Sequence, residues 1–149
     1  RCFPIEVVEL AAGAELEIAA TGRWSLQPSD PAQASPSPAN ASSLRLRCAL
    51  SSHRVPNWAV RVCAGTRAVA MSGDGAPTEE TMALYRGVAL LVHECLAVNS
   101  VPQGHAQLSD LEAIAERCAT ERILAVHVAS DRRDEMLAAL RTRASTDRP

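Results

Sequence analysis

Two segments with an alternating apolar pattern constrain the fold of this chain more than any other feature. Residues 44–50 and 58–63 carry an apolar residue at every second position, which is the period of a β-strand. The segment between them contains Pro56 and has the composition of a turn. We therefore expect two neighbouring antiparallel strands that are joined by this turn.

The two sides of these strands differ in polarity. Leu44 and Leu46 share one side of the first strand, whereas Arg45 and Arg47 share the other side, and Arg61 belongs to the polar side of the second strand. This alternation is typical of an antiparallel sheet with one covered face and one solvated face. We expect the leucines to face the core and the three arginines to lie together on an open, basic face.

Helix starts are marked by capping residues. Thr78 followed by two glutamates predicts a helix N-terminus, and apolar residues at helical spacing extend this helix to residue 98. Ser109 and Glu112 have the spacing of a capping box and predict a second helix over residues 109–117. Both helices are expected to pack on the covered face of the sheet.

These elements combine into one expected α+β domain over residues 1–144. Further strands at residues 3–10 and 15–19 complete a four-stranded antiparallel meander with two or three helices packed on one face. An extra C-terminal strand and helix follow. Residues 27–43 are rich in Pro and Ser and predict a long mobile loop, and residues 145–149 predict a frayed tail.

Composition limits the kinds of partner that the protein is expected to bind and the compartment in which it is expected to reside. The basic residues are all Arg, the net charge is −2 and aromatic residues make up only 3% of the chain. Few side chains are available to stack on bases, which argues against nucleic-acid binding. Five cysteines without a CxxC pair predict buried thiols in a reducing compartment, so we expect a cytoplasmic or nuclear protein. Apolar runs are too short to cross a bilayer, and association with a membrane surface is left open.

Motifs for catalysis or metal binding are weak in this sequence. The four histidines, His53, His93, His105 and His127, are scattered, and none has zinc-ligand spacing with a cysteine. The glycines in residues 72–75 are not followed by the Lys of a phosphate-binding loop, and no Gly-x-Ser-x-Gly is present. We therefore expect no catalytic residue, no metal and no cofactor. A small enzyme that uses Cys or His remains a third hypothesis.

The order of strand, proline-bearing turn, strand and helices resembles the RWD domain, the non-catalytic relative of ubiquitin-conjugating enzymes. The resemblance is carried by LRLRCALSSHRVPNWAVRV at residues 44–62 and extends over roughly residues 3–119. The family's turn usually contains Tyr-Pro, where this chain has Val55 and Pro56. Cys63 falls inside the second strand, and not in the loop where a conjugating enzyme carries its cysteine.

This resemblance implies a function in protein binding. It predicts a non-enzymatic scaffold or adaptor module in a multi-subunit intracellular complex, such as a kinetochore or a ubiquitin-pathway assembly. The partner would be another protein, and the expected partner-binding residues are Arg45, Arg47 and Arg61 on the open sheet face. The oligomeric state does not follow from the sequence.

An alternative comes from the C-terminal part of the chain. Residues 122–140 resemble the last strand and closing helix of a pleckstrin-homology-like domain. Under this interpretation residues 88–95 and 108–115 are strands, and the protein binds a phosphoinositide or a phosphopeptide. Recruitment to membranes would then weaken as salt is added.

Overall fold

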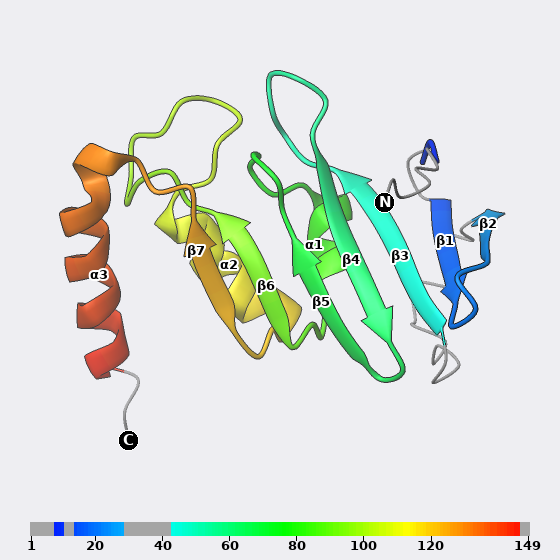
Figure 1. The fold of residues 1–149 in the computed structure, drawn as a ribbon. Helices are drawn as coiled ribbons and strands as arrows, with labels where there is room; N and C mark the ends of the chain where they lie inside the picture. Colours follow the sequence, from blue (N-terminus) through cyan, green and yellow to red (C-terminus); the bar gives the residue numbers. More distant parts are fainter. Residues whose placement is uncertain (1–7, 11–13, 29–42, 147–149) are drawn as a thin grey trace, which may run out of the picture.

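The described residues of the computed structural model, 8–10, 14–28 and 43–146, form a seven-stranded mixed sheet with helices on one face (Figure 1). The strands are β1 (Ala14–Ala19), β2 (Trp24–Pro28), β3 (Ser43–Leu50), β4 (Trp58–Ala64), β5 (Arg67–Met71), β6 (Leu90–Glu94) and β7 (Ile123–Val126). The helices are α1 (Glu79–Tyr85), α2 (Leu108–Cys118) and α3 (Arg133–Thr146). In space, the strand order is β2-β1-β3-β4-β5-β6-β7.

The sheet changes direction at β5. The strands from β2 to β5 pair antiparallel, and β3 and β4 join through the predicted turn, with Leu50 opposite Trp58. β5, β6 and β7 are parallel to one another, with α1 connecting the first pair and α2 the second. Both helices lie behind the same face of the sheet, whereas α3 stands beside β7 at its edge (Figure 1). The carboxyl ends of the three parallel strands therefore meet at one edge.

The prediction of one helix over residues 78–98 is wrong. α1 begins at the predicted cap, where Thr78 and Thr81 bond each other's backbone, but it ends at Tyr85. Gly87 then adopts a φ of +64°, which L side chains rarely adopt, and the chain turns into β6. In β6, Leu91 and His93 are buried on the helix side, and Leu90 and Val92 on the open face are apolar as well. The sequence therefore lacks the apolar-polar alternation of a strand with one solvated face, and it suits a helix equally well.

The expected orientation of the meander is also wrong. Ala59 and Arg61 of β4 and Ala70 of β5 face the helices and are buried. Leu44 and Met71, which are 44% and 57% exposed, lie on the opposite face. Small side chains allow α1 to approach the sheet closely, whereas leucine at those positions would hold it away. Alternation defines two faces but does not say which one the helices cover.

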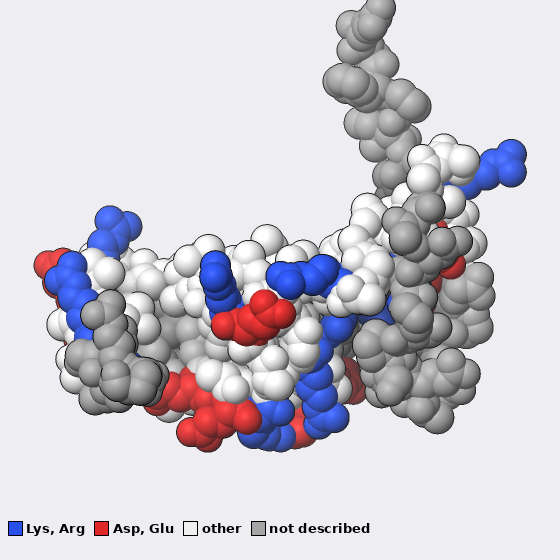
Figure 2. Space-filling view, turned by 90° about the horizontal axis from the view of Figure 1, so that it is seen from below, with Lys and Arg blue, Asp and Glu red and all other residues white. Residues whose placement is uncertain are grey.

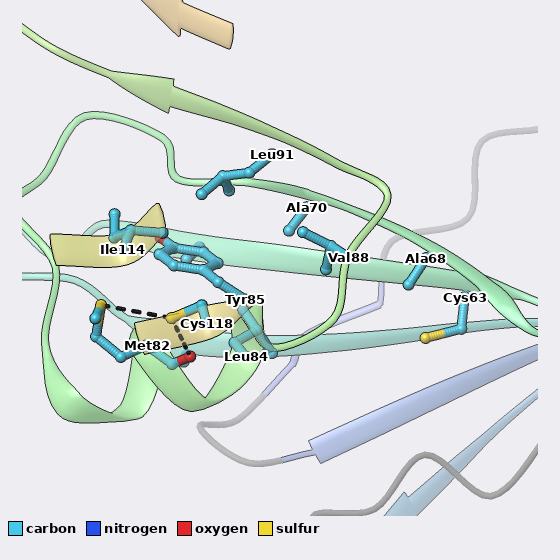
Figure 3. Packing of buried hydrophobic residues seen from close by; sticks show 12 residues of the cluster. Cys63, Ala68, Ala70, Met82, Leu84, Tyr85, Val88, Leu91, Ile114 and Cys118 are labelled. Atoms are coloured by element: carbon cyan, nitrogen blue, oxygen red, sulfur yellow. Dashed lines mark hydrogen bonds between the residues drawn. The ribbon is translucent and has the colours of Figure 1, made fainter. Parts of the chain in front are cut away.

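The main core fills the space between the sheet and these helices. Tyr85 of α1, Leu91 of β6 and Ile114 of α2 are fully buried, and they converge over the alanines of β5 (Figure 3). A second cluster joins α2 to α3 through Leu111 and Met136. Burying side chains of this size stabilises a fold by roughly 1.5–3 kcal/mol each.

The expected α+β fold, a four-stranded meander with an added strand and helix, is thus replaced by a mixed α/β sheet. Residues 8–10 form no strand, and the rest of the strand expected at 3–10 lies outside the described residues. Most of the expected loop, 29–42, and the end of the chain from residue 147 also lie outside them. Among the described helices, none has the length and hydropathy needed to cross a bilayer.

Candidate metal centre

Four polar side chains gather where the parallel strands end. Asp74 lies in the loop after β5, Glu94 is the last residue of β6, and His127 follows β7 directly. His105 comes from the connection between β6 and α2. In α/β sheets, ligands bind outside the carboxyl ends of the strands, so the topology places these residues at a suitable edge.

Glu94 is the centre of this group. Its side chain is fully buried, and its Oε1 accepts the Ala106 N–H at 3.1 Å. The same oxygen lies 3.2 Å from Nδ1 of His105, and Oε2 lies 3.5 Å from Nδ1 of His127. A carboxylate taken out of water needs such partners, because an unpaired buried charge costs several kcal/mol.

Asp74 adds a second carboxylate on the solvent side. Its Oδ1 lies 3.1 Å from Nδ1 of His127. The side chains of Asp74 and His127 are 58% and 45% exposed, so a solute reaches them from water. His127 therefore bridges a buried carboxylate and an exposed one.

The donor set fits a divalent transition metal. Ligand atoms of Glu94, His105 and His127 all lie within 4.8 Å of one another. Imidazole nitrogen and carboxylate oxygen are ordinary zinc ligands, and three protein ligands with one open position are typical of catalytic zinc. Since Asp74 contacts His127 at the same edge, the described residues supply four groups that can hold or orient a metal.

A third imidazole extends the cluster. His53 makes an edge-to-face contact with His105 at a centroid distance of 5.0 Å, and His105 makes a similar contact with His127 at 6.0 Å. Nδ1 of His53 lies 3.3 Å from the carbonyl of Val55, within its own turn. His53 thus packs against the group from the outside.

The residues on either side of Glu94 point elsewhere. His93 is buried and packs edge to face against Tyr85, and burial lowers its pKa. Cys95 lies in the second core cluster, where burial raises its pKa to about 12. Its thiol is therefore protonated near neutral pH and is no ready nucleophile or thiolate ligand. Of these three adjacent residues, Glu94 alone serves the site.

Sequence reasoning missed this group because each member is 11–22 residues from the next one, with no local spacing. The useful signal was positional: each of Asp74, Glu94 and His127 stands at or just after the end of a strand. That signal became visible only once β6 was a strand and lay between β5 and β7.

The predicted arginines lie away from this edge. Arg61 is only 8% exposed and donates from Nη1 to the carbonyls of Leu84 at 2.8 Å and Arg86 at 2.7 Å. Arg45 and Arg47 lie 3.6 and 3.9 Å from the carboxylate of Glu15. The expected open basic face is therefore the helix side of the sheet, and Arg61 is occupied by internal contacts. Binding of a partner by these three arginines stays a prediction.

Charge on the side of the molecule seen from below is mixed. Arginine and acidic side chains lie next to one another there, and no extended patch of one sign is visible among the described residues (Figure 2). This view gives no support to an electrostatic docking surface.

The sequence matches no protein-family model and no curated protein. The structure resembles the metallo-β-lactamase fold protein YhfI from Bacillus subtilis, with a TM-score of 0.55, 20% identity and coverage of 63% of this chain and 40% of that one. It also resembles the short form of human tRNase Z, with a TM-score of 0.53, 19% identity and coverage of 59% and 37%. The chain thus spans about two-fifths of the length of these structures.

These comparisons assign the fold to the metallo-β-lactamase type and overturn the RWD resemblance. The prediction of a non-enzymatic scaffold or adaptor in a kinetochore or ubiquitin-pathway complex rested on that resemblance and is wrong with it. The pleckstrin-homology-like alternative is also wrong: it correctly placed a strand within residues 88–95, where β6 lies, but residues 108–115 lie in α2 and not in a strand.

Proposed function

We propose that this chain forms part of a metal-dependent hydrolase and supplies Asp74, Glu94, His105 and His127 to its metal centre. The observation that carries the proposal is the convergence of Glu94, His105 and His127 within 4.8 Å at the carboxyl ends of parallel strands. The likeness in fold to metallo-β-lactamase fold structures supports it.

A divalent metal bound here supplies a Lewis acid and lowers the pKa of a bound water. The carboxylates of Glu94 and Asp74 hold the imidazoles of His105 and His127 in place. Glu94 faces Nδ1 of both His105 and His127, and Asp74 faces Nδ1 of His127 again. Nδ1 of each imidazole thus points at a carboxylate oxygen, and a metal bound among these atoms would replace the protons that they share.

The two carboxylates have different surroundings. Glu94 is shielded from water and has backbone and imidazole partners, so it fixes geometry. Asp74 is more than half exposed and stands where a solute enters, so its free oxygen can orient water or a polar substrate group. This division suits hydrolysis, which needs a fixed ligand set and an accessible water.

Zinc binding by the His127→Ala variant tests the proposal. His127 touches both carboxylates, so its loss should weaken Zn²⁺ binding at least about tenfold, the lower end of what loss of an orienting partner costs. Isothermal titration of the metal-free protein with Zn²⁺ gives the dissociation constant. Thr66→Ala, at an exposed position in the turn between β4 and β5, is the control and should bind as the unmodified protein does. A protein that does not bind Zn²⁺, or an equal loss in both variants, would contradict the metal centre.

Hydrolysis is tested separately from binding. The zinc-loaded protein is assayed on nitrophenyl esters, nitrophenyl phosphodiesters and a chromogenic β-lactam. We expect turnover of at least one of these classes, its loss on chelation, and its recovery on adding Zn²⁺. Zinc binding without turnover, or turnover that survives chelation, would remove the hydrolytic assignment.

A further inference from the structure

The loop that carries Asp74 is held by side chains outside the candidate centre. Asn57, immediately before β4, accepts the Asp74 backbone N–H through Oδ1 at 3.1 Å. Its Nδ2 donates to the Ser72 carbonyl at 3.1 Å and also to Oγ of Ser51. The oxygen and the nitrogen of one amide side chain thus both hydrogen-bond the loop, and they hold residues 72–74 against the turn before β4.

Packing in this loop leaves no room for larger residues. A Cβ built on Gly73 would lie 2.5 Å from Oδ1 of Asn57, and one on Gly75 would lie 2.2 Å from Oγ of Ser51. Gly73 also has a φ of +65°. Glycine on both sides of Asp74 therefore lets the loop lie directly against Asn57 and Ser51.

The same loop is tied to the other carboxylate. Ser72 is almost fully buried, and its Oγ accepts the backbone N–H of Glu94 at 2.9 Å. A continuous set of hydrogen bonds therefore runs from Asn57 through Ser72 to the end of β6. The Asn57 side chain bonds Ser51, Ser72 and the Asp74 backbone, and among the described residues it makes no hydrogen bond to an imidazole or carboxylate of the group, so its effect passes through the loop.

We propose that Asn57 is a positioning residue for the metal centre, because it holds the Asp74 carboxylate against His127 before a metal arrives. The inference rests on the proposed function. An exposed aspartate between two glycines has wide backbone freedom, and ordering it on binding would consume part of the binding free energy. The contacts of Asn57 remove that cost in advance.

Two measurements on Asn57→Ala test the proposal. Hydrogen exchange of the metal-free protein should show lost protection of the Asp74 amide, whose acceptor is Oδ1 of Asn57. Zn²⁺ affinity should fall by about 10–100-fold, as for partners that orient ligands, and the visible spectrum of the Co²⁺ form should change. Asn99→Ala, at an exposed position of the connection between β6 and α2, is the control and should alter neither.

A double-mutant cycle separates positioning from general damage. Gly73→Ala places a Cβ against Oδ1 of Asn57, so it should weaken Zn²⁺ binding more in the unmodified background than in Asn57→Ala. The strain of alanine at positive φ is common to both backgrounds and cancels. Independent effects would overturn the proposal, as would an Asn57→Ala variant with unchanged affinity and Co²⁺ spectrum. If the unmodified protein binds no Zn²⁺, the proposed function falls as well; if only Asn57→Ala is without effect, the positioning role falls alone.

Discussion

At the residue scale, Arg61 shows how one charged side chain completes a helix from another element. α1 has no basic residue in its last turn, and a helix ends with carbonyls that lack an intrahelical donor. Arg61 reaches from β4 and donates to two of these carbonyls, at Leu84 and Arg86. A cation also suits the negative end of the helix dipole. The arginine therefore joins sheet and helix where a hydrophobic side chain could not.

Replacing Arg61 should cost stability. Arg61→Met keeps much of the apolar stem but leaves two carbonyls without their charged donor, so we expect a loss of about 2–4 kcal/mol in the free energy of unfolding. Urea denaturation measures this loss. Arg47→Met, which removes only a 3.9 Å contact to Glu15 near the surface, should cost less than about 1 kcal/mol. Equal losses would show that the carbonyl contacts of Arg61 contribute little.

At the element scale, α2 ends in a conformation that its sequence does not favour. Ala119 caps the helix with a φ of +50° and a ψ of +40°, in the left-handed region where glycine is the usual residue. The side chain is exposed, so no packing compensates for the strain. The connection is kept because β7 must begin only a few residues later, alongside β6.

Glycine at this cap should stabilise the protein. Ala119→Gly removes a left-handed penalty of about 1–2 kcal/mol and adds some chain entropy to the unfolded state, so we expect a net gain of about 0.5–1 kcal/mol. Ala115→Gly, at an exposed position inside the same helix, should instead destabilise by about 1 kcal/mol. Thermal unfolding of the two variants should therefore give midpoints shifted in opposite directions. A lower midpoint for Ala119→Gly would contradict the argument.

At the scale of the whole molecule, the sheet has one covered face and one largely apolar open face. The strand register aligns Met71 with Val92 and Val92 with Leu124, which gives an apolar row across the parallel strands. Met71 and Leu124 are 57% and 53% exposed. Contiguous apolar surface of this kind is uncommon on a monomer. The open face therefore exposes apolar side chains to solvent, whereas the small side chains on the helix side are buried under α1.

The open face should bind a hydrophobic dye. Val69 and Met71 project from it, so the double substitution Val69→Lys and Met71→Lys should lower the fluorescence of bound ANS and change stability by less than about 1 kcal/mol. Ala70→Lys, on the helix side of the same strand and 5% exposed, should cost several kcal/mol because it buries an unpaired charge. Unchanged dye binding in the double variant would mean that this face is not the exposed apolar surface.

Strands, turns and helix caps could be predicted from residues that lie close together in the sequence. The strands at β3 and β4 and the start of α1 at Thr78 depend on alternation and on a capping contact, which involve neighbours only a few residues apart. The second helix cap was placed two residues late, because Gln107 is the cap and Asp110 accepts its N–H at 2.8 Å. Such features can be predicted since their physical causes lie within one turn of chain.

The tertiary structure decided which face is buried, that β6 is a strand, and where Asp74, Glu94, His105 and His127 meet. β6 became a strand because β5 and β7 supply its hydrogen-bond partners on both sides, although its apolar run suits a helix equally well. The candidate centre then arose because parallel pairing brings the carboxyl ends of three strands to one edge. The sequence by itself determined the strands, turns and caps that neighbouring residues specify. The pairing of distant segments determined the covered face and the site, since their energy comes from contacts that no local pattern contains.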